Sequence, residues 1–167
     1  MSTTRRDRSL SDLSRRQFGA VARHQLLEVG FSATSIRRAV ERGGLIKVFP
    51  RVYRVDSVPV TREQRQMCAT LFGGNQAALC NSSAAQLLGF IPSHPSAIHI
   101  SSPRRVAPKP GLRVYHRLSL PGDFPTRVGP LPVTSPARTL LDLCGQGHSP
   151  CGDGPRHRTP GPGGFVR

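Results

Sequence analysis

The sequence predicts an α+β protein, with an N-terminal winged helix-turn-helix followed by a small mixed α/β segment and a disordered C-terminal tail. Two observations carry this prediction. Residues 32–55 read as one basic helix, a stop at Gly43 and Gly44, and a short β-hairpin. Residues 145–167 hold eleven Gly or Pro among 23 positions, and such a run has too few apolar side chains to offset its chain entropy.

The N-terminal unit spans residues 14–55 and follows a charged arm, residues 1–13, that we expect to be disordered. A short helix around residues 14–18 ends at Gly19. The helix-turn-helix then begins with a helix over residues 23–29, and a glycine turn leads to its second helix. Ser32 is placed to cap that second helix by accepting a hydrogen bond from a free backbone N–H of the first turn. A helix, a glycine turn and a basic helix in this order are typical of a helix-turn-helix. A narrow apolar stripe turns the second helix toward a core: Ile36, Ala39 and Val40.

Residues 56–144 predict a small, incomplete α+β segment. Thr61 opens a helix with capping-box spacing to Gln64, and a second helix covers residues 82–88. Two strand-like runs follow, residues 97–101 and 112–116. A last helix opens at Pro136, a residue well suited to a first turn. This helix has hardly begun when the composition changes at Gly145, and we therefore interpret residues 145–167 as a frameshifted ending.

Positive charge is the strongest global signal. The net charge is +15 and the pI is near 11.6, which favours nucleic acid or another acidic surface as a partner. The charge is concentrated locally, with nine Lys or Arg against two Glu between Ser14 and Arg54. Two alternatives stay open: a genome rich in Arg codons, and a solvated helix face with no partner.

Helix-turn-helix geometry divides the candidate DNA-binding residues into two groups. The N-terminal part of the second helix meets base edges in the major groove of double-stranded DNA, whereas cations farther along fix the register on phosphates. The candidates for base edges are Ser32, Thr34, Ser35 and Arg38. The candidates for phosphates are Arg37, Arg42, Lys47, Arg51 and Arg54.

The other groups of polar residues do not predict a catalytic or binding site. Arg104, Arg105 and Lys109 lie in a proline-rich loop, which is most simply a solvated connection between two strands. His99 and His116 can face each other across the predicted strand pair, but a structural or solvent-facing role fits both better. The aspartates are scattered, so no carboxylate pair suits a metal or a scissile bond. We expect no enzyme and no cofactor.

Four Cys and His residues near the end of the chain do not have the spacing of a typical zinc site. Their spacing is C-x3-H-x2-C-x5-H, and they lack the usual short Cys-Cys knuckle. They also fall in or next to the presumed out-of-frame tail, so we predict no metal site. The four residues are Cys144, His148, Cys151 and His157.

Several stretches resemble one actinobacterial family. The motifs are GAVARHQLLEVGFSATSIRRAVERGGLIKVFPRVYRV, TREQRQMCATL, NSSAAQLLGF, IHISSPRR, GLRVYHR and PVTSPARTLLDL, within residues 17–143. They resemble the AbiEi-type antitoxins of abortive-infection systems, which are often fused to a nuclease-like domain related to very-short-patch repair endonucleases. This chain departs at the wing, where Pro50-Arg51 stands in place of a basic residue and Gly, and it lacks the nuclease-like half.

The resemblance implies a transcriptional regulator. It predicts sequence-specific binding to an operator and antitoxin-type repression of a toxin–antitoxin operon. It also implies a separate nucleotidyltransferase toxin as a functional partner. Two alternatives remain: a truncated fragment of a nuclease-like protein, and a non-functional remnant. With no run near the ~18 apolar residues that span a bilayer and no secretory signal, we expect a cytoplasmic protein without membrane contact and with reduced cysteines.

Overall fold

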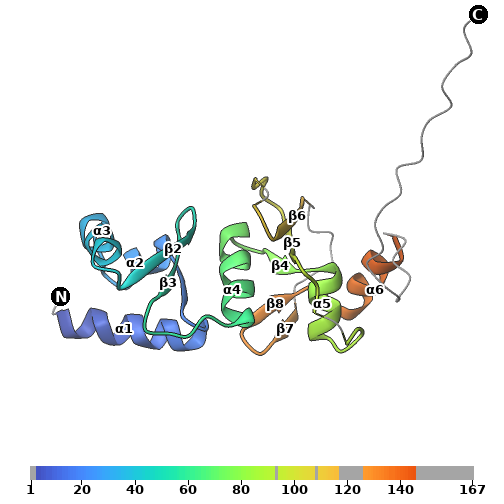
Figure 1. Cartoon of the computed structure of the whole chain (residues 1–167), viewed down its shortest axis with the longest axis horizontal. Coiled ribbons are helices and arrows are strands. Elements are labelled where there is room, and N and C mark those ends of the chain that lie inside the picture. Colours follow the sequence, from blue (N-terminus) through green and yellow to red (C-terminus); the bar gives the residue numbers. More distant parts are fainter. Residues whose placement is uncertain (1–2, 93, 108, 117–125, 146–167) are drawn as a thin grey trace, which may run out of the picture.

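A computed structural model of the chain describes residues 3–92, 94–107, 109–116 and 126–145. It has a mixed α+β fold with two sheets, and the two parts of the chain lie side by side with helix α4 between them (Figure 1). The predicted tail, residues 145–167, falls outside these ranges apart from Gly145. The zinc candidates His148, Cys151 and His157 also lie outside the described residues.

The first part carries three helices and a three-stranded antiparallel sheet. Its strands lie in the order β1-β3-β2, and β1 pairs with β3 from Ala20↔Arg54 to Ala22↔Val52. A small core of Val21, Leu26, Ile36 and Leu45 joins the sheet to the helices. The elements are α1 (Thr3–Arg16), β1 (Ala20–Ala22), α2 (Arg23–Glu28), α3 (Ala33–Glu41), β2 (Leu45–Phe49) and β3 (Val52–Val55).

Helix α1 corrects the prediction of a disordered arm over residues 1–13. Leu10 and Leu13 pack against the small core, and the guanidinium of Arg6 lies 5.7 Å from the ring centroid of Phe31. Two leucines at i, i+3 form an apolar stripe that is too narrow to predict an amphipathic helix within a charged sequence. Contacts with the rest of the fold therefore order this stretch, as they do for most short helices.

The second part is built on a five-stranded sheet in the order β6-β5-β4-β8-β7. Strand β5 pairs in parallel with β6, as β4 does with β8, and the other pairs are antiparallel. Its elements are α4 (Arg62–Gly73), β4 (Ala78–Leu79), α5 (Asn81–Leu87), β5 (Ile98–Ser102), β6 (Leu112–His116), β7 (Thr126–Val128), β8 (Leu131–Val133) and α6 (Pro136–Gly145). The predicted cap of α4 is confirmed, because Thr61 Oγ1 accepts from the backbone N–H of Gln64 at 3.1 Å.

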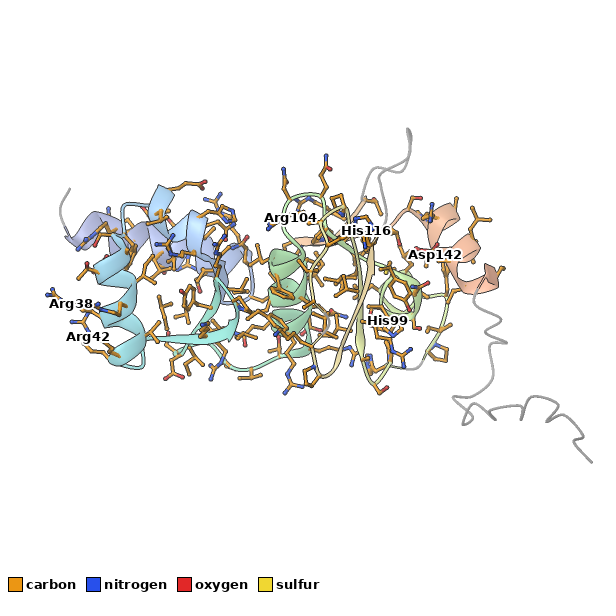
Figure 2. All side chains as sticks on the ribbon, turned by 90° about the horizontal axis from the view of Figure 1, so that it is seen from above. Arg38, Arg42, His99, Arg104, His116 and Asp142 are labelled. Atoms are coloured by element: carbon orange, nitrogen blue, oxygen red, sulfur yellow. The ribbon has the colours of Figure 1, made fainter. Side chains whose placement is uncertain are left out.

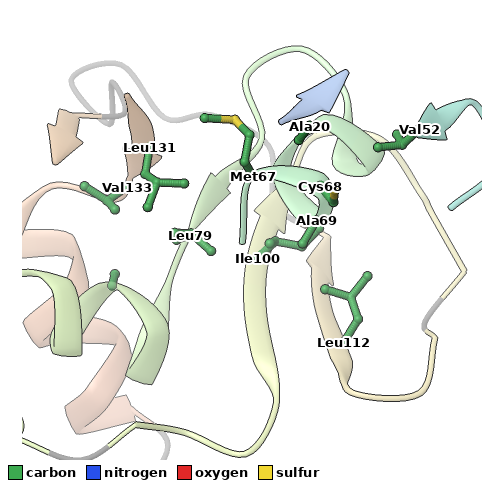
Figure 3. Close-up of a cluster of buried hydrophobic side chains, with 11 residues drawn as sticks. Ala20, Val52, Met67, Cys68, Ala69, Leu79, Ile100, Leu112, Leu131 and Val133 are labelled. Carbon is green, nitrogen blue, oxygen red and sulfur yellow. The ribbon is translucent and has the colours of Figure 1, made fainter. Parts of the chain in front are cut away.

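Helix α4 belongs to both parts, because one continuous core surrounds it (Figure 3). Ala20 and Val52 reach this core from the small sheet, and Leu79 and Ile100 reach it from the large one. The ring of Phe49 stacks on that of Phe72, with centroids 4.8 Å apart. The two parts are therefore packed against each other. Among the helices of the described residues, none is long and apolar enough to cross a membrane.

Candidate nucleic-acid interface

The N-terminus of α3 is closed by a reciprocal pair of serines. Ser32 Oγ accepts from the backbone N–H of Ser35 at 3.1 Å, and Ser35 Oγ accepts from the backbone N–H of Ser32 at 2.7 Å. This is the hydrogen-bond pattern of a capping box, with Ser at the position usually held by Glu or Gln. Both hydroxyls are thus engaged with the helix end, and Ser32 is the cap that the sequence predicts.

The outward side of α3 is polar and mainly cationic. Ile36 is 3% exposed and points into the small core, while Thr34, Arg38 and Arg42 are exposed. Figure 2 shows the side chains of Arg38 and Arg42 projecting from α3 at one end of the molecule. Arg37 is also exposed, but its Nε lies 3.5 Å from Glu41 Oε1, so part of its charge is balanced within the helix.

The hairpin of β2 and β3 brings two more predicted residues to the surface. Lys47 and Arg51 are both exposed. Pro50 and Arg51 form the turn, and Arg51 has a φ of 65°, in the left-handed region that favours glycine. Arg51 therefore holds a backbone conformation that glycine adopts without a Cβ clash. Its carbonyl also accepts from the backbone N–H of Arg23 at 2.8 Å, which ties the turn to the start of α2.

Arg54 lies apart from the other phosphate candidates. Its side chain is 20% exposed, and its Nη1 lies 3.6 Å from Asp56 Oδ1. Arg54 also lies near Cys68 of α4. Burial raises the pKa of the Cys68 thiol to about 12, and the positive charge of Arg54 partly opposes this rise. Arg54 thus faces the junction with α4 rather than the exposed face of the hairpin.

The two strand histidines do not face each other, and that suggestion was wrong. In the parallel register of β5 and β6, His99 lies opposite Arg113, and His116 lies opposite Ser102. His99 is 8% exposed, with Nδ1 3.3 Å from the hydroxyl of Tyr115. A structural role for His99 follows from this burial, whereas His116 is exposed (Figure 2).

Two further titratable groups, Asp142 and Cys144, lie on helix α6. Asp142 is buried on α6 and pairs with Arg138, whose Nε lies 2.9 Å from Asp142 Oδ1. Cys144 is exposed in the last turn of that helix. Within the part of the chain that the structure describes, no three His, Cys, Asp or Glu side chains are grouped so as to hold a metal ion.

Sequence reasoning missed the surroundings of the hairpin. Lys109 and Pro110 line one hollow together with Lys47 and the hairpin residues up to Pro50. The loop between β5 and β6 thus lies beside the hairpin of β2 and β3, a neighbourhood that spacing along the chain does not show. Arg23 was not among the predicted residues either, although its backbone N–H donates to the carbonyl of Arg51 beside the hairpin. Its position at the start of a predicted helix, after a basic segment, was the signal in the sequence.

The comparisons with known proteins bear on both parts of the chain. Residues 77–154, less than half of the chain, match the family model of the AbiEi antitoxin C-terminal domain. No curated protein matches the sequence. The fold is similar to the crystal structure of the RV2827C protein from Mycobacterium tuberculosis, with a TM-score of 0.50 and 17% identity, over 86% of this chain and 61% of that one. The chain thus spans about three fifths of that protein, and at this identity the likeness concerns the fold alone.

Proposed function

We propose that this chain is a sequence-specific DNA-binding protein, and that residues 14–55 act as a winged helix-turn-helix. The observation that carries the proposal is the exposed cationic side of α3, with a basic hairpin next to it and an apolar core behind it. The order of α2, turn, α3 and hairpin supports this assignment. The net charge of +15 suits a polyanionic partner.

Within this proposal, the exposed residues of α3 have different roles. Thr34 and Arg38 are free to meet base edges, and a guanidinium can donate two hydrogen bonds to one guanine. Ser32 and Ser35 act indirectly, because their hydroxyls hold the N-terminus of the helix. We assign the phosphate contacts to four exposed cations: Arg37, Arg42, Lys47 and Arg51. Arg54 is largely buried beside Asp56 and has a supporting role in the hairpin.

The regulatory role we propose is that of an antitoxin-type repressor without enzymatic activity. The match of residues 77–154 to an AbiEi antitoxin domain supports this role. The mechanism is occlusion: α3 enters the major groove of an operator within a promoter, and bound protein keeps polymerase away. The functional partner is a nucleotidyltransferase toxin encoded in the same operon.

The decisive experiment is a binding titration of the full chain with DNA from upstream of its own gene and with a scrambled duplex. Tight binding to the upstream DNA and weak binding to the scrambled duplex are expected. Arg38→Ala should remove about 1–3 kcal/mol of this preference, if Arg38 reads a base edge. Arg65→Ala, which removes an exposed arginine of α4, is the matched control and should leave the preference unchanged. Equal affinity of the wild-type chain for both DNAs would contradict the proposal.

A further inference from the structure

A groove lies between surface residues of the two parts of the molecule, beside the second half of α4. Its walls come from the end of α1, the start of α2, the hairpin turn, residues 74–77, the loop after β5 and the β7–β8 turn. Its volume is about 1890 Å³, whereas pockets for small molecules typically measure about 300–1,000 Å³. The groove therefore has the size of a site for part of a macromolecule.

Arginines from both walls line this groove. One wall contributes residues of α1, α2 and the hairpin, and the other contributes the loop after β5 and strand β7. The six are Arg15, Arg16, Arg23, Arg51, Arg104 and Arg127. Five of them are exposed, and Arg23 is half-buried. None of the described residues that line the groove is an Asp or a Glu.

These arginines differ from others in the fold, which have carboxylate partners. Arg37 pairs with Glu41, Arg54 with Asp56, and Arg138 with Asp142. Among the described residues, no carboxylate pairs with any of the six groove arginines. Like charges gathered on one concave surface repel each other, so the groove presents a positive potential that an anion would relieve.

The fold fixes the backbone that carries these cations. The buried hydroxyl of Ser102 accepts from the backbone N–H of Arg104 at 3.0 Å and lies 2.9 Å from the carbonyl of Gly73. The side chain of Arg104 passes over Gly74, where an added Cβ would come within 2.9 Å of its Nη1. Figure 2 shows Arg104 next to α4, well apart from Arg38 and Arg42 on α3.

Hydrogen bonds also tie together the elements of the opposite wall. The side-chain amides of Gln17 and Gln25 exchange two hydrogen bonds, of 3.0 and 2.9 Å, which fix the end of α1 to α2. Arg51 is fixed by the bond from the Arg23 backbone N–H to its carbonyl. Arg51 thus belongs both to the hairpin proposed to contact DNA and to the groove, so the two cationic surfaces are continuous.

We propose that this groove binds the sugar-phosphate backbone of the same DNA duplex that α3 reads, in the flank beyond the hairpin. This inference rests on the proposed function and extends the DNA-binding surface to the second part of the chain. Continuity through Arg51 favours the same duplex over a separate ligand. Exposed arginines with several free donors suit phosphates, and contacts of this kind add affinity without reading sequence.

The test uses the full chain and two duplexes. One is the shortest upstream fragment whose binding still depends on Arg38, and the other carries about one helical turn of arbitrary sequence added to each end. The added flanks should raise the affinity of the wild-type chain several-fold. Arg104→Ala/Arg127→Ala should lose this gain, and its slope of log K against log salt on the long duplex should be shallower by about 2.

A matched control removes the same charge from outside the groove. Arg65→Ala/Arg113→Ala takes two exposed arginines from the second part and should keep the gain from the flanks. Arg15→Ala/Arg16→Ala removes two arginines from the opposite wall and should lose the gain as well. It keeps the inference testable if Arg104→Ala/Arg127→Ala does not fold. Thermal unfolding of each variant shows whether it is folded.

The possible results separate the two proposals. If no upstream fragment binds in an Arg38-dependent way, the proposed function fails and this inference fails with it. If such binding exists but the groove variants behave like the wild type or like the control, the groove inference alone is overturned. A third result would also overturn the groove inference. If the groove variants bind duplex like the wild type but lose binding to a single-stranded DNA or RNA oligonucleotide, the groove serves a different nucleic acid.

Discussion

The backbone N–H of Arg23 donates a hydrogen bond to the carbonyl of Arg51, with 2.8 Å between nitrogen and oxygen. This bond joins the first residue of α2 to the turn of the hairpin. Two arginines distant in the sequence are thereby held together at the mouth of the groove. The position of the hairpin relative to α2 is a consequence of backbone geometry, and side-chain changes that alter this geometry should alter DNA binding.

The turn residue Arg51 offers the first prediction. Arg51→Gly and Arg51→Ala remove the same charge, but only glycine adopts a φ of 65° without a Cβ clash. Arg51→Gly should therefore be about 1 kcal/mol more stable than Arg51→Ala. Chemical denaturation measures the difference in the free energy of unfolding. Both variants should lose DNA affinity equally, and a large difference in affinity would show that conformation rather than charge matters there.

Ser32 should contribute to stability through the cap of α3. Ser32→Ala should lower the free energy of unfolding by about 1 kcal/mol, because the N–H of Ser35 loses its acceptor. Ser32→Asp keeps an acceptor and should retain most of the stability. It adds a negative charge on the proposed DNA face, however, so its affinity for duplex should fall. Thermal unfolding and duplex titration of the two variants give the comparison, and equal stability of both would contradict the role of the cap.

Cys68 should make the folded state sensitive to alkali. Its pKa is raised by burial from 9.0 to about 12, so the unfolded thiol ionises first as the pH rises. The contribution to stability is fully present below pH 9 and is lost between about pH 9 and 12. Replacing Cys68 with Ala should flatten the alkaline slope of the unfolding free energy relative to the wild type. Alkylation followed by peptide mapping should modify the exposed Cys144 long before Cys68 at pH 8.

The stack of Phe49 on Phe72 should couple the two parts of the chain. Phe72→Ala removes a half-buried ring from the junction and should cost about 2 kcal/mol of unfolding free energy. Phe90→Ala is the control, since Phe90 is 41% exposed. If the junction holds the groove together, Phe72→Ala should also reduce the gain in affinity from flanking DNA. Equal destabilisation by the two variants would show that the stack has no special role.

Salt should weaken DNA binding steeply. Neutralising about five to seven phosphates gives a slope of log K against log salt of roughly −5 to −6. Fluorescence anisotropy between low and physiological salt provides the slope. A flat response would mean that the charge of the chain is not used on DNA.

Local sequence signals were sufficient for α3 and the hairpin. Ser32 marks the start of the helix, the glycines mark its end, and the basic residues mark its exposed face. The strands β1, β7 and β8 escaped prediction because three residues are too short to show a period. Helix α1 escaped it because Leu10 and Leu13 gain their partners only in the folded chain.

The groove could not be predicted for a different reason. Arg16, Arg51 and Arg127 lie on separate elements, and nothing in their spacing shows that they share a surface. They meet because α4 packs on both sheets, which is a tertiary outcome. The same holds for Lys109 and Lys47, which line one hollow although a long stretch of chain separates them.

Because α4 is packed on both sides, the molecule has no free hinge in the described residues between the hairpin and the large sheet. A protein with a loose linker can bind sites whose two halves vary in separation. Here the distance from α3 to the arginines of the second part is fixed by the packing of a single helix, α4. If the proposed function holds, the flank of an operator can vary in sequence without loss of binding. The number of base pairs between that flank and the site of α3 cannot vary, because the protein does not adjust the distance between its two contacts.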